Sequence, residues 1–171
     1  MLAKAYFKRS LCLCAVAVLL ISGCAATGPA YTELKSTIPS LEAGKARLYF
    51  LRESAFMGSA IAARIQVNGI KVVDLYNDGF IYMDRPSGNV FIMVDAFMNP
   101  IGEWRGTFSL ESGKEYYFFV TPNSNKAWAV ALLGMAGALV TEGGPFKVYL
   151  IPKEMALEQL KTKKLSGSSS H

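Results

Sequence analysis

Turn-forming residues recur about every ten positions along most of the chain, and this spacing constrains the fold more than any other feature. The strongest signal is Asn68-Gly69, which lies between two strand-like segments. An Asn-Gly pair favours a type I′ hairpin turn, because both of its central residues need a positive φ. Further turns are expected at Asn77-Asp78-Gly79, Pro86-Ser87-Gly88-Asn89 and Glu111-Ser112-Gly113-Lys114. The chain should therefore consist of short strands joined by tight turns.

Eight segments between these turns are rich in residues that favour strands. They are Ala46–Arg52, Ile61–Val67, Ile70–Leu75, Phe80–Asp84, Val90–Phe97, Trp104–Leu110, Glu115–Thr121 and Phe146–Ile151. Short strands at this spacing predict an all-β fold, an antiparallel β-sandwich.

Pro152 ends the last of these segments, and residues 153–165 are predicted to form a C-terminal α-helix. Glu154 lies near the start of this helix, and Lys161, Lys163 and Lys164 lie near its end, which suits the helix dipole. Leu157 and Leu160 would share one face, so the helix could pack on a sheet.

The first 23 residues have the three parts of a secretory signal. Lys4, Lys8 and Arg9 precede an apolar run at 11–21, and the small residues Ser22 and Gly23 follow it. This apolar run would cross roughly half of a ~30 Å hydrocarbon core, which argues against a permanent membrane-spanning helix. An ordinary secreted protein would need no more than these features.

Cys24 distinguishes this signal from that of an ordinary secreted protein, because it directly follows Ser22-Gly23, which in turn follow the aliphatic pair Leu20-Ile21. The arrangement is typical of a bacterial lipoprotein signal, cleaved between Gly23 and Cys24, with Cys24 acylated by palmitate-type chains. Two or more chains hold a protein stably on a bilayer. Ala25 and Ala26 follow instead of an Asp, which favours the outer membrane and a domain facing the periplasm.

This interpretation divides the chain into four parts. Residues 1–23 are the signal peptide, 24–44 a lipidated tether, 45–165 the β-sandwich domain with its helix, and 166–171 a disordered tail. Within the tether, Leu34, Ile38 and Leu41 are expected to pack on the domain as one helical turn.

Composition excludes several classes of function. Three of the 18 basic residues leave with the signal, so the net charge falls from +5 to +2, and we expect no nucleic-acid partner. Removal of the signal and acylation of Cys24 leave no free thiol, and His171 is the terminal residue. A Cys–His or Ser–His centre needs a positioned base, so we expect no catalysis, no metal and no cofactor.

Four short segments, in this order and spacing, resemble the DUF2846 family of bacterial lipoproteins, whose function is uncharacterised. In that family's pattern we would expect Pro-Gly-His where this chain has Ser87-Gly88-Asn89. The resemblance implies a β-sandwich lipoprotein and brings no catalytic residues. The segments are Ala43-Gly44-Lys45-Ala46-Arg47-Leu48-Tyr49-Phe50, Val67-Asn68-Gly69-Ile70-Lys71-Val72, Ser112-Gly113-Lys114-Glu115-Tyr116-Tyr117-Phe118 and Gly144-Pro145-Phe146-Lys147-Val148.

The segment 127–140 carries no charge over 14 residues and is the candidate contact for a partner. Short apolar runs are usually buried, so a segment closing one end of the sandwich is the simpler interpretation. The alternative is an exposed apolar loop that meets lipid or a partner protein. Its candidate contact residues are Trp128, Leu132, Leu133, Met135 and Leu139.

Two other groups of residues invite a functional interpretation. Asp74, Asp78, Asp84 and Asp95 would serve a hydrolase only if two of them lay close together with one raised pKa; solvated acids at strand ends are the simpler view. Strand aromatics such as Tyr49 and Tyr117 could form an outward face for sugars or peptides. They could equally pair with one another across neighbouring strands.

We therefore expect a membrane-anchored periplasmic lipoprotein that acts as a non-catalytic binding or accessory module of the cell envelope. Its partners would be the bilayer, through Cys24, and an envelope protein whose identity the sequence does not give. The alternative is a lipoprotein that binds an apolar or glycan ligand, and a carboxylate-dependent hydrolase is the third possibility.

Overall fold

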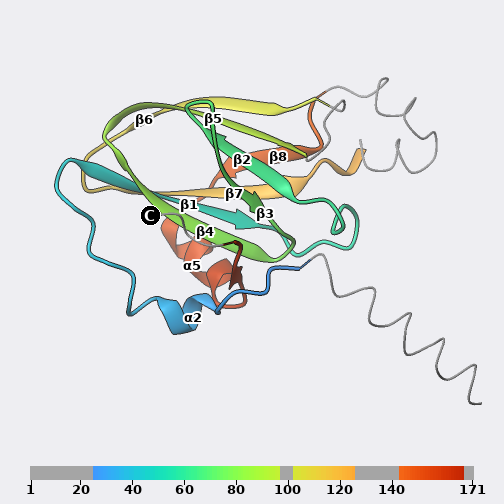
Figure 1. The fold of residues 1–171 in the computed structure, drawn as a ribbon, viewed down its shortest axis with the longest axis horizontal. Coiled ribbons are helices and arrows are strands. Elements are labelled where there is room, and N and C mark those ends of the chain that lie inside the picture. The colour runs from blue at the N-terminus through green and yellow to red at the C-terminus, as the bar shows by residue number, and fades with distance from the viewer. Residues whose placement is uncertain (1–24, 97–101, 126–142, 168–171) are drawn as a thin grey trace, which may run out of the picture.

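The computed structural model describes residues 25–96, 102–125 and 143–167. In these ranges two β-sheets pack face to face, and two short helices cover the outer face of one of them (Figure 1). The predicted all-β sandwich with a C-terminal helix is confirmed.

The strands follow the expected segments closely. They are β1 (Lys45–Arg52), β2 (Ala63–Val67), β3 (Ile70–Leu75), β4 (Gly79–Pro86), β5 (Gly88–Ala96), β6 (Trp104–Leu110), β7 (Glu115–Pro122), β8 (Phe146–Leu150) and β9 (Lys164–Leu165). The helices are α2 (Tyr31–Leu34) and α5 (Lys153–Leu160). The turn between β2 and β3 is the expected one, since Asn68 has φ 51° and Gly69 has φ 78°.

One sheet has the order β8-β7-β1-β4-β9 and the other has the order β3-β2-β5-β6. The first sheet is mixed, because β1 runs parallel to β7 and β4 runs parallel to β9, whereas the sequence predicted antiparallel pairing only. The chain enters β7 from the second sheet through the turn at 111–114, so β7 joins β1 without a hairpin. The four-stranded sheet is antiparallel throughout.

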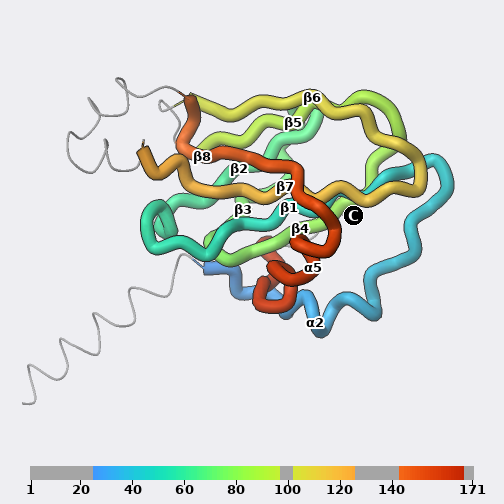
Figure 2. Tube along the Cα trace, turned by 180° about the vertical axis from the view of Figure 1, so that it is seen from behind, coloured from blue at the N-terminus to red at the C-terminus, as the bar shows by residue number. Residues whose placement is uncertain are grey.

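The position of β1 explains its burial. It lies at the centre of the five-stranded sheet, and seven of its eight residues are buried. One face packs in the sandwich core through Leu48 and Phe50. The other face, through Tyr49 and Leu51, packs against α2 and α5 (Figure 2). In contrast β2 is buried at alternate residues, because the outer face of the four-stranded sheet carries no helix among the described residues.

The C-terminal helix is shorter than predicted. It ends at Leu160, and Lys164–Leu165 pairs with β4 as β9. Lys163, which was expected near the helix end, is instead buried, and its Nζ lies 3.1 Å from Asp78 Oδ1. A tertiary ion pair and strand pairing therefore replace the helix-dipole interaction that the sequence suggested.

Segments assigned to the tether and to the tail are tied to the domain. Ala25 forms a bridge with Asn77, and Ala26 is buried. Leu34 packs on the helix side of the five-stranded sheet, within the expected single helical turn. Ser166 is also buried, and its Oγ accepts a hydrogen bond from the Tyr76 N–H at 3.2 Å.

Candidate functional site

The residues predicted for lipidation and for partner contact lie outside the described ranges. Gly23 and Cys24 precede the first described residue, Ala25. The candidate contact residues Trp128, Leu132, Leu133, Met135 and Leu139 fall between Asn125 and Gly143. Both assignments stay predictions.

The four aspartates are each paired with a different basic residue rather than with one another. Asp84 and Asp95 accept two hydrogen bonds each, from Arg47 at 2.6 and 2.8 Å and from Arg64 at 2.6 and 3.1 Å. Asp74 pairs with Lys71, and Asp78 with Lys163. In the part of the chain that is described, no three His, Cys, Asp or Glu residues are grouped to hold a metal ion.

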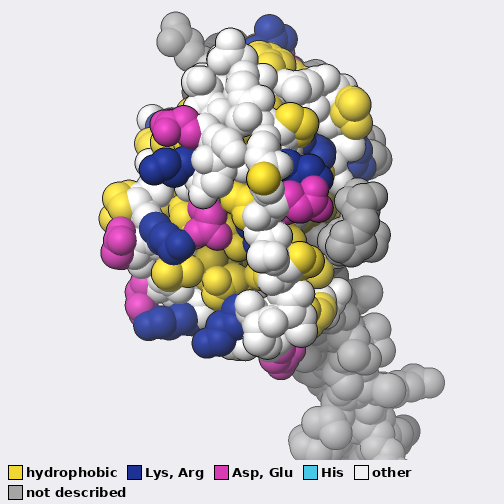
Figure 3. All heavy atoms as spheres, turned by 90° about the vertical axis from the view of Figure 1, so that its left-hand side faces the viewer, with side chains coloured by type: hydrophobic (Ala, Val, Ile, Leu, Met, Phe, Trp, Pro, Cys, Tyr) yellow, Lys and Arg dark blue, Asp and Glu magenta, His cyan; other side chains and the backbone are white. Residues whose placement is uncertain are grey.

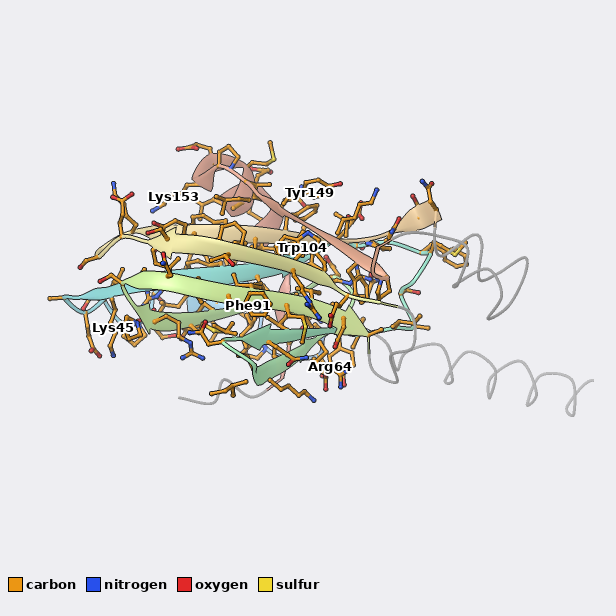
Figure 4. All side chains as sticks on the ribbon, turned by 90° about the horizontal axis from the view of Figure 1, so that it is seen from above. Lys45, Arg64, Phe91, Trp104, Tyr149 and Lys153 are labelled. Atoms are coloured by element: carbon orange, nitrogen blue, oxygen red, sulfur yellow. The ribbon has the colours of Figure 1, made fainter. Side chains whose placement is uncertain are left out.

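Asp74 and Asp95 do share one face. Both are aligned with Arg64 across the four-stranded sheet, one on β3 and the other on β5, and Arg64 lies between them on β2. The guanidinium therefore separates the two carboxylates. Figure 4 shows Arg64 on this face, near the end of the molecule where the described chain begins.

The aromatic residues divide between the two faces of the five-stranded sheet, as strand alternation requires. Phe50 and Phe118 stack inside the sandwich with ring centroids 5.1 Å apart. Tyr49 lies on the other face, with its ring 4.9 Å from that of Tyr117 and 6.0 Å from that of Tyr82. Both tyrosines are the register partners of Tyr49 on the neighbouring strands. The tyrosines thus pair across strands, which was one of the two expected arrangements.

Arg47 extends this tyrosine row toward the start of β1. It is only 4% exposed, forms the two hydrogen bonds to Asp84, and lies 5.4 Å from the centre of the Tyr82 ring. The hydrogen bond to Asp84 raises the pKa of Arg47 above its ordinary value and outweighs burial, which acts in the opposite direction. Arg47 is therefore a fixed cation held in place by an acid and an aromatic ring.

Glu115 occupies the corresponding position on β7. Its carboxylate accepts hydrogen bonds from the Tyr117 hydroxyl at 2.8 Å and from Lys153 Nζ. Burial acts to raise the pKa of Glu115, but the hydrogen bonds from Lys153 and Tyr117 outweigh it and hold the pKa below its ordinary value. Burial raises the pKa of Tyr49 to about 12. The pKa of Tyr117 is also raised, mainly by burial and secondly by its hydrogen bond to Glu115. At neutral pH both phenols are therefore un-ionised and Glu115 is charged.

Arg47, Glu115 and Lys153 border a hollow of about 490 Å³, which we call the Arg47 hollow. Residues from the segment before β1, from β1, from the turn before β7 and from the start of α5 line it. Three cationic side chains and one carboxylate face it, so its lining is positive overall. Lys114 has no ion-pair partner in the described ranges. The lining residues are Ser40, Leu41, Arg47, Gly113, Lys114, Glu115 and Lys153.

Figure 3 views the end of the molecule where β1 begins and shows basic and acidic side chains around an apolar patch. Lys45 and Lys153 lie toward this same end in Figure 4. A second hollow, of about 430 Å³, lies toward the opposite end of β1. It is lined by one acid, Glu53, and one base, Lys147, so its charges balance.

Arg52 is a buried cation without a carboxylate partner in the described ranges. It is fully buried, and its Nε has no hydrogen-bond partner among the residues that the structure describes. Its other nitrogens donate to the Val120 carbonyl at 3.5 Å and to the Gly58 carbonyl at 3.3 Å, and its guanidinium lies 4.6 Å from the centre of the Phe146 ring. Burial lowers its pKa to about 10. Arg52 thus connects the loop after β1 to the end of β7.

The sequence did not identify the Arg47 hollow. Its charged residues come from three regions, and only the register of β1 with β4 and β7 brings Arg47 beside Asp84 and Glu115. The detectable signal was the alternation of charged and tyrosine residues, which recurs as Arg47 and Tyr49 on β1 and as Glu115 and Tyr117 on β7.

The chain belongs to the DUF2846 family, a family of proteins of unknown function, whose model matches residues 42–133. This match confirms the resemblance inferred from the four sequence segments. It covers β1 to β7 and most of the lining of the Arg47 hollow. No curated protein matches the chain. Within the described residues, no helix has the length and apolarity needed to cross a membrane.

Proposed function

We propose that the protein is a membrane-anchored lipoprotein that acts as a non-catalytic binding or accessory module of the bacterial cell envelope. Acylated Cys24 would hold it on the outer membrane with its domain in the periplasm. The observation that carries this proposal is the attachment of the chain to the domain directly after Cys24. A lipoprotein signal followed at once by docked chain suits a domain held at a membrane surface.

The docked chain is held by several backbone hydrogen bonds. Ala26 N–H donates to the Asn77 carbonyl at 3.2 Å, and Gly28 N–H donates to the Leu165 carbonyl at 3.2 Å. Leu165 N–H returns a bond to the Pro29 carbonyl at 2.9 Å. Cys24, the proposed lipid-bearing residue, would therefore directly precede Ala25, which is fixed to the domain through Asn77.

Replacement of Cys24 by alanine is expected to abolish membrane attachment. Without a thiol there is no acylation site, and the several acyl chains that would hold the protein are lost. The measurement is the distribution of the full-length protein between membrane and soluble fractions of the envelope, with mass spectrometry of the N-terminal peptide. Thr27→Ala, a substitution near Cys24 that keeps the thiol, serves as the control and should stay in the membrane fraction.

Crosslinking of the wild-type protein in its own envelope tests the accessory role. A protein partner that is captured by the wild type and lost in Cys24→Ala would support it. Membrane attachment that persists unchanged in Cys24→Ala would contradict the anchor.

The second candidate is ligand binding, and the Arg47 hollow is the observation that favours it. Its lining carries Arg47, Lys114 and Lys153 against the single carboxylate of Glu115, which suits an acidic glycan better than an apolar ligand. The carboxylate-dependent hydrolase ranks last, because each of the four candidate aspartates pairs with a different base.

Lys114→Glu is expected to remove a co-purifying acidic glycan, since it changes the unpaired cation of the hollow into an anion. Native mass spectrometry of the detergent-purified protein would detect the bound mass. Lys35→Glu makes the same charge change at an exposed residue that does not line the hollow, and it should retain the ligand. Equal ligand mass on both variants would exclude the hollow as the binding site.

A further inference from the structure

The end of the domain that receives the N-terminal chain also carries the most exposed large apolar side chain among the described residues. Phe56 is 96% exposed and lies in the loop between β1 and β2, residues 53–62, which we call the Phe56 loop. Ile61, in the same loop, is 41% exposed, and Tyr76, beside the β3–β4 turn, is 38% exposed. From Ser54 to Ala63 the chain has no charged residue.

Asn77 joins the Phe56 loop to the start of the described chain. Its side-chain Oδ1 accepts a hydrogen bond from Ala55 N–H at 3.1 Å, and its carbonyl accepts one from Ala26 N–H at 3.2 Å. Ala25 forms its bridge with the same residue. In Figure 1 the described chain begins at the end of the molecule that holds this loop. Ala55, next to Phe56, and Ala25, next to Cys24, are thus both bound to Asn77.

The loop is held in place rather than attached only at its ends. The Gly58 carbonyl accepts a hydrogen bond from buried Arg52, and Gly58 lies against Pro122 at the end of β7. Ser59 N–H donates to the Phe56 carbonyl at 3.3 Å within the loop. Phe56 is therefore exposed on a loop whose backbone is fastened on both sides of it.

We propose that the Phe56 loop is a membrane-contact surface, which inserts Phe56 and Ile61 into the bilayer interface beside the lipid anchor. This inference rests on the proposed acylation of Cys24. We assign the bilayer as the partner of this loop because no spacer separates the proposed anchor from the domain. Cys24 is joined directly to Ala25, and Ala25 is fixed to Asn77. A loop that is uncharged after Glu53 and carries an exposed aromatic residue suits the boundary between headgroups and acyl chains.

This placement also orients the domain. β1 has eight residues and spans roughly 25 Å, with its last residue, Arg52, at the anchored end and Lys45 at the other. The Arg47 hollow lies at the Lys45 end and would face away from the membrane, toward the periplasm. A ligand or partner in the hollow would therefore approach from solution and not from the bilayer.

The test is lipid quenching of a fluorophore on the full-length acylated protein in vesicles of phosphatidylethanolamine and phosphatidylglycerol with spin-labelled acyl chains. Acylation leaves no free thiol in the processed chain, so Ser59→Cys labels the Phe56 loop and Ser87→Cys labels the turn at the opposite end. Quenching at position 59 should exceed that at position 87 several-fold. Adding Phe56→Ser and Ile61→Ser to the Ser59→Cys variant should reduce its quenching to the level at position 87.

The outcomes separate the two proposals. Equal quenching at positions 59 and 87, with acylation confirmed by mass spectrometry of the N-terminal peptide, would overturn the membrane-contact surface and leave the anchor intact. An N-terminal peptide without acyl chains would overturn the anchor and, with it, this inference. Circular dichroism of each variant is the control that its fold is retained.

Discussion

Replacement of Asp84 by alanine is expected to lower the free energy of unfolding by about 3 kcal/mol, because it leaves buried Arg47 without its acid. The side chain of Arg47 is 5% exposed, and Asp84 supplies both of its charged hydrogen bonds. Removing one partner of a buried pair costs more than the pair itself contributes, since the remaining charge is desolvated and uncompensated. Urea unfolding followed by tryptophan fluorescence measures the loss.

Glu158→Ala is the matched control for this prediction. It also removes an acid from an ion pair, but Glu158 and Lys161 are 70% and 63% exposed, so the change should be within about 0.5 kcal/mol. The double variant Arg47→Met with Asp84→Leu should recover most of the loss, because neither member of the pair then leaves an uncompensated buried charge. If Asp84→Ala costs no more than Glu158→Ala, Arg47 is hydrated through the hollow and the pair is not a structural element.

This ion pair also shows where sequence reasoning stops. Arg47 and Asp84 are 37 positions apart, and only the register of β1 against β4 brings them together. That register depends on which strands are neighbours, and the sequence gives no signal for the parallel pairing of β1 with β7. The positive lining of the Arg47 hollow follows from these pairings and could not be predicted from local patterns.

Local signals, in contrast, predicted the strands well. The Asn68-Gly69 turn has the positive φ at both residues that the pair was expected to need. The segments 70–75 and 104–110 match β3 and β6 at both ends. Each of these features depends on residues close in sequence: a turn that requires particular residues, and a run of strand formers between two turns.

The C-terminal helix combines a feature set by local sequence with one set by distant contacts. Its start at Lys153 follows from Pro152, which is a local signal. Its end at Leu160 is set by distant contacts, because Lys163 pairs with Asp78, 85 positions away, and Leu165 bonds to Pro29. Charged residues that suited a longer helix were therefore overridden by tertiary pairing.

Replacement of Phe118 by alanine is expected to lower the free energy of unfolding by about 4 kcal/mol. Phe118 is fully buried on β7 and stacks on Phe50 of the same sheet. Its ring also meets Phe108 of the opposite sheet edge-on, with centroids 4.9 Å apart. Removing it opens a cavity between two β-sheets, and paired strands cannot collapse to fill such a cavity completely. Urea unfolding in detergent solution measures the change.

Phe56→Ala makes the same substitution at a phenylalanine that is 96% exposed, and it should change the free energy of unfolding by less than about 0.5 kcal/mol. A loss at Phe118 as small as that at Phe56 would contradict its place between the sheets. The contrast also bears on function. An apolar side chain whose removal leaves the fold intact has no role in folding, so a neutral Phe56→Ala is what the proposed contact of Phe56 with the bilayer requires.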